Sequence, residues 1–312
     1  METNKHLIKF ENFSEYETFL NSDEFVTPNV SLIKSEGNKL YYKPLPTLEC
    51  GFYTLKCGDL YLNDDVINSE TKQRTLTSGE ISSKNIFYSA KDNALISYSS
   101  GFGFVNGVCN TKNPDDGYNT FKYRNGDEPG TLKIMSQKGT TTNEPELNNG
   151  RYFKENNGVL DFVMEEENAS NFIIEPVTEL PVSMNFANDE EGAYASLWTP
   201  VALKLPEDVV AYGCVIKNGV LSLTLIDGNV IPKNTGVLLN NVNAKANYVA
   251  KLSITDEVGE PIKGNTFEGT YITCKNVNPG EYYSLGKKDG KVALYKYTGA
   301  NLSAFRARTK CI

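Results

Sequence analysis

The sequence has 312 residues, with 39 Asp and Glu against 31 Lys and Arg and a formal net charge of −8. This acidic balance, without clusters of Lys and Arg interleaved with aromatic residues, argues against a nucleic-acid-binding surface. The only histidine is His6 and no C-x-x-C pair occurs, so His-rich metal sites and zinc or redox motifs are excluded and no cofactor is expected.

Length and composition indicate a chain of several β-domains. A length of 312 residues exceeds the ~250–300 at which a single core stops growing. The 18 Tyr, 15 Phe and 25 Gly favour strands and tight turns over helices. We predict three regions, 1–46, 47–177 and 178–312, and we expect the six scattered cysteines to be buried thiols.

The region 1–46 is predicted to form a short helix followed by a hairpin. Apolar residues recur at helical spacing over residues 10–25, and Ser14 with Glu17 makes a capping box. The stretch "VSLIKSEGNKLYYK" predicts two strands around a Gly37-Asn38 turn. Acidic residues interrupt every apolar run, so neither an export signal nor a membrane span is expected, and synthesis in the cytoplasm follows.

The region 47–177 is predicted to be a β-trefoil-like, ricin-like domain. "GFYTLKCGDLYLN", "NIFYSAKDNALISYSSG" and "FKYRNGDEPGTLKIMS" each read as an aromatic strand, a polar turn and a second strand, and "GRYFKENNGVLDFVM" follows. Weak repeats of this kind are typical of a trefoil or another closed barrel.

The region 178–312 is predicted to be an antiparallel β-sandwich. Its apolar and polar residues alternate over several longer strands, and Asn218-Gly219, Asp227-Gly228 and Asp289-Gly290 provide hairpin turns. Trp198 lies on one of these strands and is expected in the sandwich core.

Candidate binding residues cluster near the turns of the second region. The loop "NPDDGYN" at 113–119 supplies oxygen donors that could hold Ca²⁺ or form a solvated turn, and its spacing lacks the terminal Glu of a calcium loop. A tyrosine face can stack on a sugar while Asp and Asn accept its hydroxyls. The residues that fit a weak glycan site are Tyr98, Asp115, Asp116, Tyr118 and Asn119.

These tyrosines, together with Tyr123 and Tyr152, could instead pack in the core of a small barrel. Carboxylates such as those of "EEEN" at 165–168 could act in glycoside cleavage, but 39 acidic residues guarantee some such pair. The glycines of "SGFGFVNG" do not open a helix, so a dinucleotide site is not indicated.

The segment from residue 169 onward resembles a C-terminal β module of surface proteins from gut Bacteroidales. There, a segment of the type A-S-x-aromatic-x-I-E-x-V-x-x-L-P-V closes a ricin-like trefoil and leads into P-x-A-x-x-x-P-x-x-V-x-A-Y. The matching stretches here are "ASNFIIEPVTELPV", "PVALKLPEDVVAY" and "VIPKNTGVLL". This resemblance implies the trefoil and sandwich folds and leaves the ligand open.

The N-terminal segment resembles that of structural proteins from crAss-like phages, in which F-x-N-x-x-E-Y and P-N-V-S precede the exposed domains. The matching residues are Phe10, Asn12, Glu15, Tyr16 and the run from Pro28 to Ser31. The resemblance implies a non-enzymatic virion component, a head-fibre or decoration protein, located in the virion and forming dimers or trimers.

In such a component residues 1–46 dock on capsid or tail proteins while the β-domains attach weakly to host surface polysaccharide. The expected docking contacts are Phe13, Tyr16, Phe19 and Leu20, which could instead pack on the chain's own hairpin. The alternatives are a secreted bacterial adhesin or carbohydrate-binding module, and a glycan-cleaving enzyme.

Overall fold

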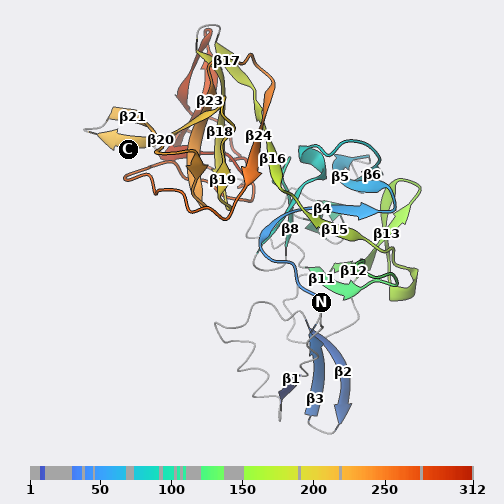
Figure 1. The fold of residues 1–312 in the computed structure, drawn as a ribbon. Coiled ribbons are helices and arrows are strands. Elements are labelled where there is room, and N and C mark those ends of the chain that lie inside the picture. The colour runs from blue at the N-terminus through green and yellow to red at the C-terminus, as the bar shows by residue number, and fades with distance from the viewer. Residues whose placement is uncertain are drawn as a thin grey trace.

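The computed structural model describes residues 8–10, 30–36, 39–44, 46–67, 74–90, 94–101, 104–105, 108–109, 121–136, 151–188, 191–217, 220–274 and 277–310. Within these ranges the chain is mainly β, in several antiparallel sheets, which confirms the mainly β part of the predicted fold class (Figure 1). The helical residues described are the 3-10 helices η1 (Ser83–Asn85) and η3 (Glu166–Asn168).

A three-stranded antiparallel sheet lies nearest the N-terminus in the sequence. Its order is β1 (Ile8–Phe10), β3 (Lys39–Pro44), β2 (Val30–Glu36). Glu36 pairs with Lys39, which confirms the hairpin predicted around Gly37 and Asn38. Phe10 pairs with Leu40, so the helix predicted from residue 10 is wrong at its first residue, where strand pairing satisfies the backbone instead. Residues 11–29 of that prediction lie outside the described ranges.

The first β-unit, residues 46–177, contains a ten-stranded antiparallel sheet in the order β11-β12-β13-β14-β6-β5-β4-β7-β8, with β15 paired to β4. Its strands are β4 (Gly51–Cys57), β5 (Leu60–Val66), β6 (Arg74–Thr77), β7 (Phe87–Ser89), β8 (Leu95–Ser97), β11 (Phe121–Asn125), β12 (Leu132–Ser136), β13 (Arg151–Asn156), β14 (Val159–Val163) and β15 (Ile173–Pro176). A separate pair is formed by β9 (Phe104–Val105) and β10 (Val108–Cys109).

Aromatic side chains fill the core of the first β-unit. In β11 Phe121 and Tyr123 are buried while Lys122 and Arg124 are less so, as the two-residue period of a strand requires. Phe153 packs its ring 5.6 Å from Phe121 and 6.0 Å from Phe172, centroid to centroid. Phe172 also exchanges two backbone hydrogen bonds with Leu132, so the chain entering β15 ties β12 to the strands around β4.

A buried ion pair braces the other end of the first β-unit. Arg74 Nη2 lies 2.9 Å from Asp64 Oδ1, and the side chains of Arg74 and Asp64 are only 3% and 5% exposed. The second carboxylate oxygen of Asp64 accepts hydrogen bonds from the hydroxyls of Ser97 at 2.5 Å and Ser99 at 2.8 Å. The carboxylate is therefore satisfied on both oxygens, which is the condition for tolerating its burial.

The second β-unit, residues 178–310, is built from three antiparallel sheets. A four-stranded sheet has the order β16 (Glu179–Met184), β24 (Tyr248–Ile254), β19 (Leu203–Lys204), β22 (Val230–Ile231), and a five-stranded sheet the order β17 (Phe186–Asn188), β18 (Gly192–Thr199), β23 (Thr235–Asn241), β20 (Val210–Lys217), β21 (Val220–Leu225). The third sheet has the order β26 (Lys291–Lys296), β25 (Tyr282–Lys288), β27 (Arg308–Lys310).

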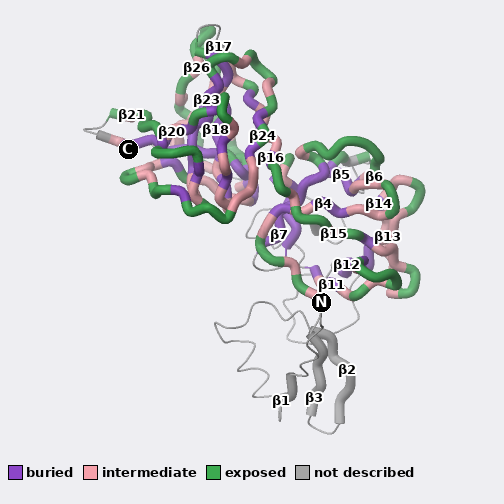
Figure 2. The backbone as a smooth tube through the Cα atoms, viewed as in Figure 1, coloured by how far each residue is buried: buried purple, intermediate pink, exposed green. Residues whose placement is uncertain are grey.

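Strand β23 shows why these sheets stack. Six of its seven residues are buried, which an antiparallel strand reaches only when both of its faces are covered. Val237 and Leu239 belong to one buried cluster, whereas Leu238 between them belongs to another with Leu285 of β25. The five-stranded sheet therefore carries a core on each face, and the predicted sandwich character is confirmed (Figure 2).

Local turn chemistry is also as predicted at the β25–β26 hairpin. Lys288 pairs with Lys291, and Asp289 and Gly290 between them both have positive φ, 49° and 79°. Two positive φ values in a two-residue loop define the turn that matches the twist of the flanking strands.

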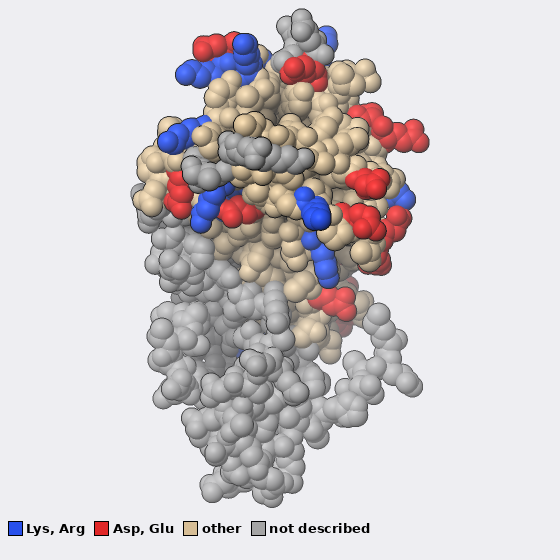
Figure 3. Space-filling view, turned by 90° about the vertical axis from the view of Figure 1, so that its left-hand side faces the viewer, with Lys and Arg blue, Asp and Glu red and all other residues tan. Residues whose placement is uncertain are grey.

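Charged side chains of both signs are scattered among uncharged residues on the described surface that Figure 3 shows. On the face drawn in Figure 3, Lys and Arg are interspersed with Asp and Glu, so no continuous basic patch is present there. Among the described residues no helix is long and apolar enough to cross a membrane.

Candidate functional site

The structure separates the residues that the sequence suggested for binding. Phe13, Tyr16, Phe19 and Leu20, the predicted docking contacts, lie outside the described residues. So do Asp115, Asp116, Tyr118 and Asn119, together with the loop considered for calcium. Of the predicted sites, only Tyr98 has a described side chain.

Tyr123 and Tyr152 lie in the core, which is the alternative to glycan binding for these residues. Tyr123 is fully buried, and Tyr152 is 5% exposed. The Tyr152 hydroxyl donates to Glu166 Oε2 at 3.2 Å, and the Arg124 guanidinium carbon lies 5.9 Å from the Tyr152 ring centroid. Burial raises the pKa of Tyr152 to about 12. These rings brace the first β-unit.

Tyr98 lies where the two β-units meet. Its hydroxyl donates to the carbonyl oxygen of Pro181 in β16 at 3.3 Å. Burial raises the pKa of Tyr98 to about 12, and the positive charge of Arg306 offsets part of that rise. A tyrosine in this position joins the two units through both its ring and its hydroxyl.

Five aromatic rings form what we call the junction cluster: Phe52, Tyr88 and Tyr98 from the first β-unit, and Tyr271 and Phe305 from the second. Ring centroids lie 5.6 Å apart for Phe52 and Phe305, 5.2 Å for Tyr98 and Phe305, and 5.3 Å for Tyr88 and Tyr271. These separations fall in the range of favourable aromatic pairs, each worth about 0.5–1.5 kcal/mol beyond burial.

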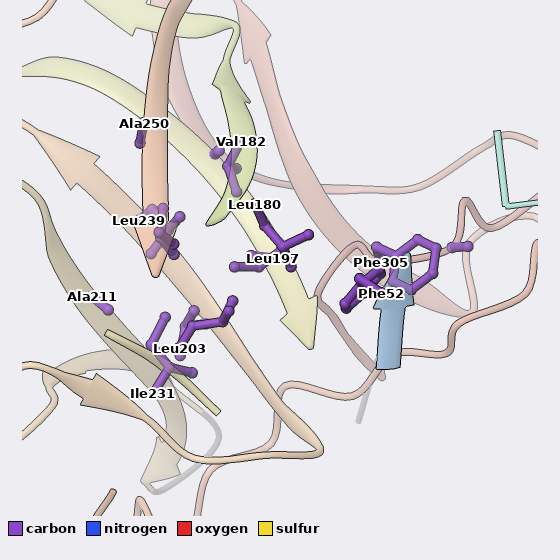
Figure 4. Packing of buried hydrophobic residues seen from close by; sticks show 14 of the residues in the cluster. Phe52, Leu180, Val182, Leu197, Leu203, Ala211, Ile231, Leu239, Ala250 and Phe305 are labelled. Atoms are coloured by element: carbon purple, nitrogen blue, oxygen red, sulfur yellow. The ribbon is translucent and has the colours of Figure 1, made fainter. Parts of the chain in front are cut away.

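The junction cluster belongs to one continuous core. The same buried cluster contains Phe52 and Ile96 of the first β-unit and Leu180, Leu197 and Leu239 of the second. Figure 4 shows Phe52 and Phe305 side by side at the edge of the aliphatic residues of the sandwich. Two β-units that share a core are expected to move as one body, unlike domains joined by a small polar interface.

Hydrogen bonds to the backbone also join the two β-units at the junction. Thr273 N donates to Gly101 O at 2.9 Å, and the Thr273 hydroxyl donates to Ser100 O at 3.0 Å. Gly101 has a φ of +68°, and a Cβ atom there would lie 2.2 Å from the Cβ of Ala304. Glycine is thus required both by the backbone conformation and by the approach of the second β-unit.

Two hollows flank the junction cluster. The larger, about 640 Å³, lies between residues 49–53 and 176–177 of the first β-unit and residues 200–202, 232–233 and 254–259 of the second. Its charged residues are Glu49, Lys233, Asp256 and Glu257, and Glu257 pairs with Lys204 at 3.0 Å. The smaller, about 270 Å³, includes Glu175, Glu179 and Lys251. Both are open, mixed-charge grooves beside a packed seam.

Three further observations bear on chemistry at the described residues. No group of three or more His, Cys, Asp or Glu side chains is arranged among them to hold a metal ion. Cys214 is buried as expected, whereas Cys50 is exposed at the large hollow, because it lies in the turn before β4 rather than in a strand. Trp198 is half-buried on β18, where Gly269 packs against its indole, so it does not reach the core position predicted for it.

No sequence pattern predicted the junction cluster. Phe52 and Phe305 are far apart in the sequence, and contacts between such distant residues produce no local pattern of apolar residues. Comparison with protein-family models, with curated proteins and with solved structures finds no match for this chain.

Proposed function

We propose that the chain is a non-enzymatic virion structural protein, a capsid head-fibre or decoration protein that projects its β-domains for weak, multivalent attachment to host surface glycans. The proposal takes residues 1–46 as the docking segment for other virion proteins and 47–177 as a β-trefoil. It also takes the protein to act in the virion as a dimer or trimer.

The single observation that carries the proposal is the core shared across the junction. The buried cluster runs from Phe52 and Tyr88 into Leu180 and Leu197, so the two β-units form one stiff body. In Figure 1 the sheet β1-β3-β2 lies at the far side of the first β-unit from the second β-unit. A stiff body held at one end presents its far end at a fixed distance, which suits a projecting attachment protein.

Stiffness matters because attachment by many weak sites depends on geometry. Each bound copy raises the effective concentration of the neighbouring binding sites. This gain is lost when the geometry prevents several sites from binding at once. If the two β-units form one rigid body, the distance between the docking end and the ligand-facing end stays fixed. Weak individual sites would then suffice for firm attachment.

Docking is tested by removing residues 1–45 and measuring incorporation into virions. A second variant keeps the full chain and replaces the four predicted docking residues, Phe13, Tyr16, Phe19 and Leu20, with serine. We expect both proteins to keep the β-units folded and both to be lost from purified particles. Incorporation at the level of the unchanged chain in both variants would contradict the docking role.

Two other functions remain as alternatives with their own outcomes. Display of the protein on the surface of uninfected bacterial cells would favour an adhesin or carbohydrate-binding module. Release of oligosaccharides from host capsule by the purified chain would favour a glycan-cleaving enzyme.

A further inference from the structure

Another cavity lies within the second β-unit, and it shares no lining residue with the two junction grooves. It encloses about 200 Å³ between the β16–β17 connection, β18, β25 and the segment 302–308. We call it the arginine cavity, because Arg306 and Arg308 both line it and no lining residue is acidic. In a chain with a net charge of −8, a cavity lined by two arginines and no acidic residue is unexpected.

Arg308 is the less accessible of the two. Its residue is 8% exposed, and its Nε and Nη1 atoms are buried with no hydrogen-bond partner among the described residues. Its guanidinium carbon lies 5.3 Å from the ring centroid of Tyr282, a cation–π contact that fixes the side chain. Glu268 exchanges backbone hydrogen bonds with Arg308, but no ion pair within 4.0 Å joins them in the described structure.

Arg308 therefore adds positive charge beside the cavity, while its Nε and Nη1 atoms are buried away from any ligand in it. Arg306 is exposed and makes one hydrogen bond, from Nη1 to the carbonyl oxygen of Ser196 at 3.2 Å. The rest of its planar donor fork remains available, and that fork matches a carboxylate in bidentate geometry.

The remaining lining indicates more than a simple anion. The residues Ser196, Ser284 and Ser303 line the same space, and Tyr297 lines it as well. The Tyr297 hydroxyl donates to the carbonyl oxygen of Asn301, which holds that side chain in place. Hydroxyls that both donate and accept, beside an aromatic residue, are suited to a sugar ring.

We infer that the arginine cavity binds one uronic-acid residue of an acidic polysaccharide, with its carboxylate toward Arg306 and Arg308 and its hydroxyls toward the serines. A volume of about 200 Å³ is below the ~300–1,000 Å³ of sites for drug-sized ligands, so it holds a single sugar unit. The inference rests on the proposed attachment to surface glycans and names their chemical class.

The test is a calorimetric titration of the full chain with trigalacturonate, with the neutral trisaccharide of galactose as the matched ligand. We expect trigalacturonate to bind with a Kd of about 1 mM or tighter and the neutral sugar not to bind. Inorganic sulfate serves as a third ligand, and we expect it to bind at least about tenfold more weakly than trigalacturonate because it uses the guanidinium groups alone.

Variants assign the binding to the cavity. Arg306→Gln is exposed and should leave the fold intact while weakening trigalacturonate about tenfold, the loss of one charge-assisted pair. Arg308→Met removes the positive charge from the cavity at similar side-chain volume and should weaken binding by a similar factor. Arg124→Gln, whose parent residue pairs with Glu166 at 2.8 Å in the first β-unit, is the control and should leave the affinity unchanged.

Any of three results would overturn the inference: equal binding of the neutral trisaccharide, sulfate binding as tightly as trigalacturonate, or full affinity in Arg306→Gln. Absence of trigalacturonate binding while the 1–45 deletion still abolishes virion incorporation refutes the cavity and leaves the virion role standing. Trigalacturonate binding that depends on Arg306, together with undiminished virion incorporation of the 1–45 deletion, would support the cavity and refute the virion role.

Discussion

Replacing Phe52 with alanine is expected to lower the free energy of unfolding by about 3–5 kcal/mol and to separate the unfolding of the two β-units. Phe52 is 2% exposed, and its ring contacts Tyr88 and Tyr98 on its own side and Phe305 on the other. Truncation leaves a cavity at the seam that neither sheet can close without moving. Urea unfolding followed by far-ultraviolet circular dichroism would then show two transitions in place of one.

The control for Phe52→Ala is Phe153→Ala, an equally large truncation within the first β-unit alone. Phe153 is fully buried and contacts Phe121, Phe162 and Phe172, all of the first β-unit. We expect a similar loss of stability but a single transition, since the junction is untouched. A Phe52→Ala protein that unfolds in one transition with the unchanged midpoint would show that the junction carries little energy.

Replacing Asp64 with alanine is expected to cost about 3–5 kcal/mol, because it leaves the Arg74 guanidinium buried without its counter-ion and removes the acceptor for two serine hydroxyls. The double variant Asp64→Leu/Arg74→Met should cost less than the single variant, since it buries no unmatched charge. The midpoint of urea unfolding measures both.

A neighbouring ion pair provides the matched control for Asp64. Asp65 pairs with Lys84 at 2.7 Å, but both side chains are 51% exposed. Asp65→Ala should therefore cost no more than about 1 kcal/mol. If Asp64→Ala costs as little as Asp65→Ala, or if the double variant is as unstable as the single one, burial of the pair does not contribute as described.

The sequence predicted those parts of the fold that short-range physics controls. Asp289-Gly290 forms its turn because both residues tolerate positive φ, and the predicted hairpin around Gly37 and Asn38 pairs Glu36 with Lys39. Neither depends on distant parts of the chain.

The candidate sites were harder to predict, because they depend on which strands meet. Tyr98 follows a short strand near a polar turn, a pattern shared by an exposed sugar-stacking residue and a core residue, and only its contact with Pro181 distinguishes them. Arg306 and Arg308 read as polar positions of a final strand. Their convergence on one cavity follows from the pairing of β27 with β25, which no local pattern specifies.

The most direct test of the shared core uses the single tryptophan of the chain, Trp198, which lies in β18 of the second β-unit. Phe153→Ala removes packing from the first β-unit only, and urea unfolding is followed by Trp198 fluorescence. A common core predicts that the midpoint of the Trp198 transition falls by about 1 M urea, as the whole body loses stability. An unchanged Trp198 midpoint would mean that the two β-units unfold independently, and would contradict the account.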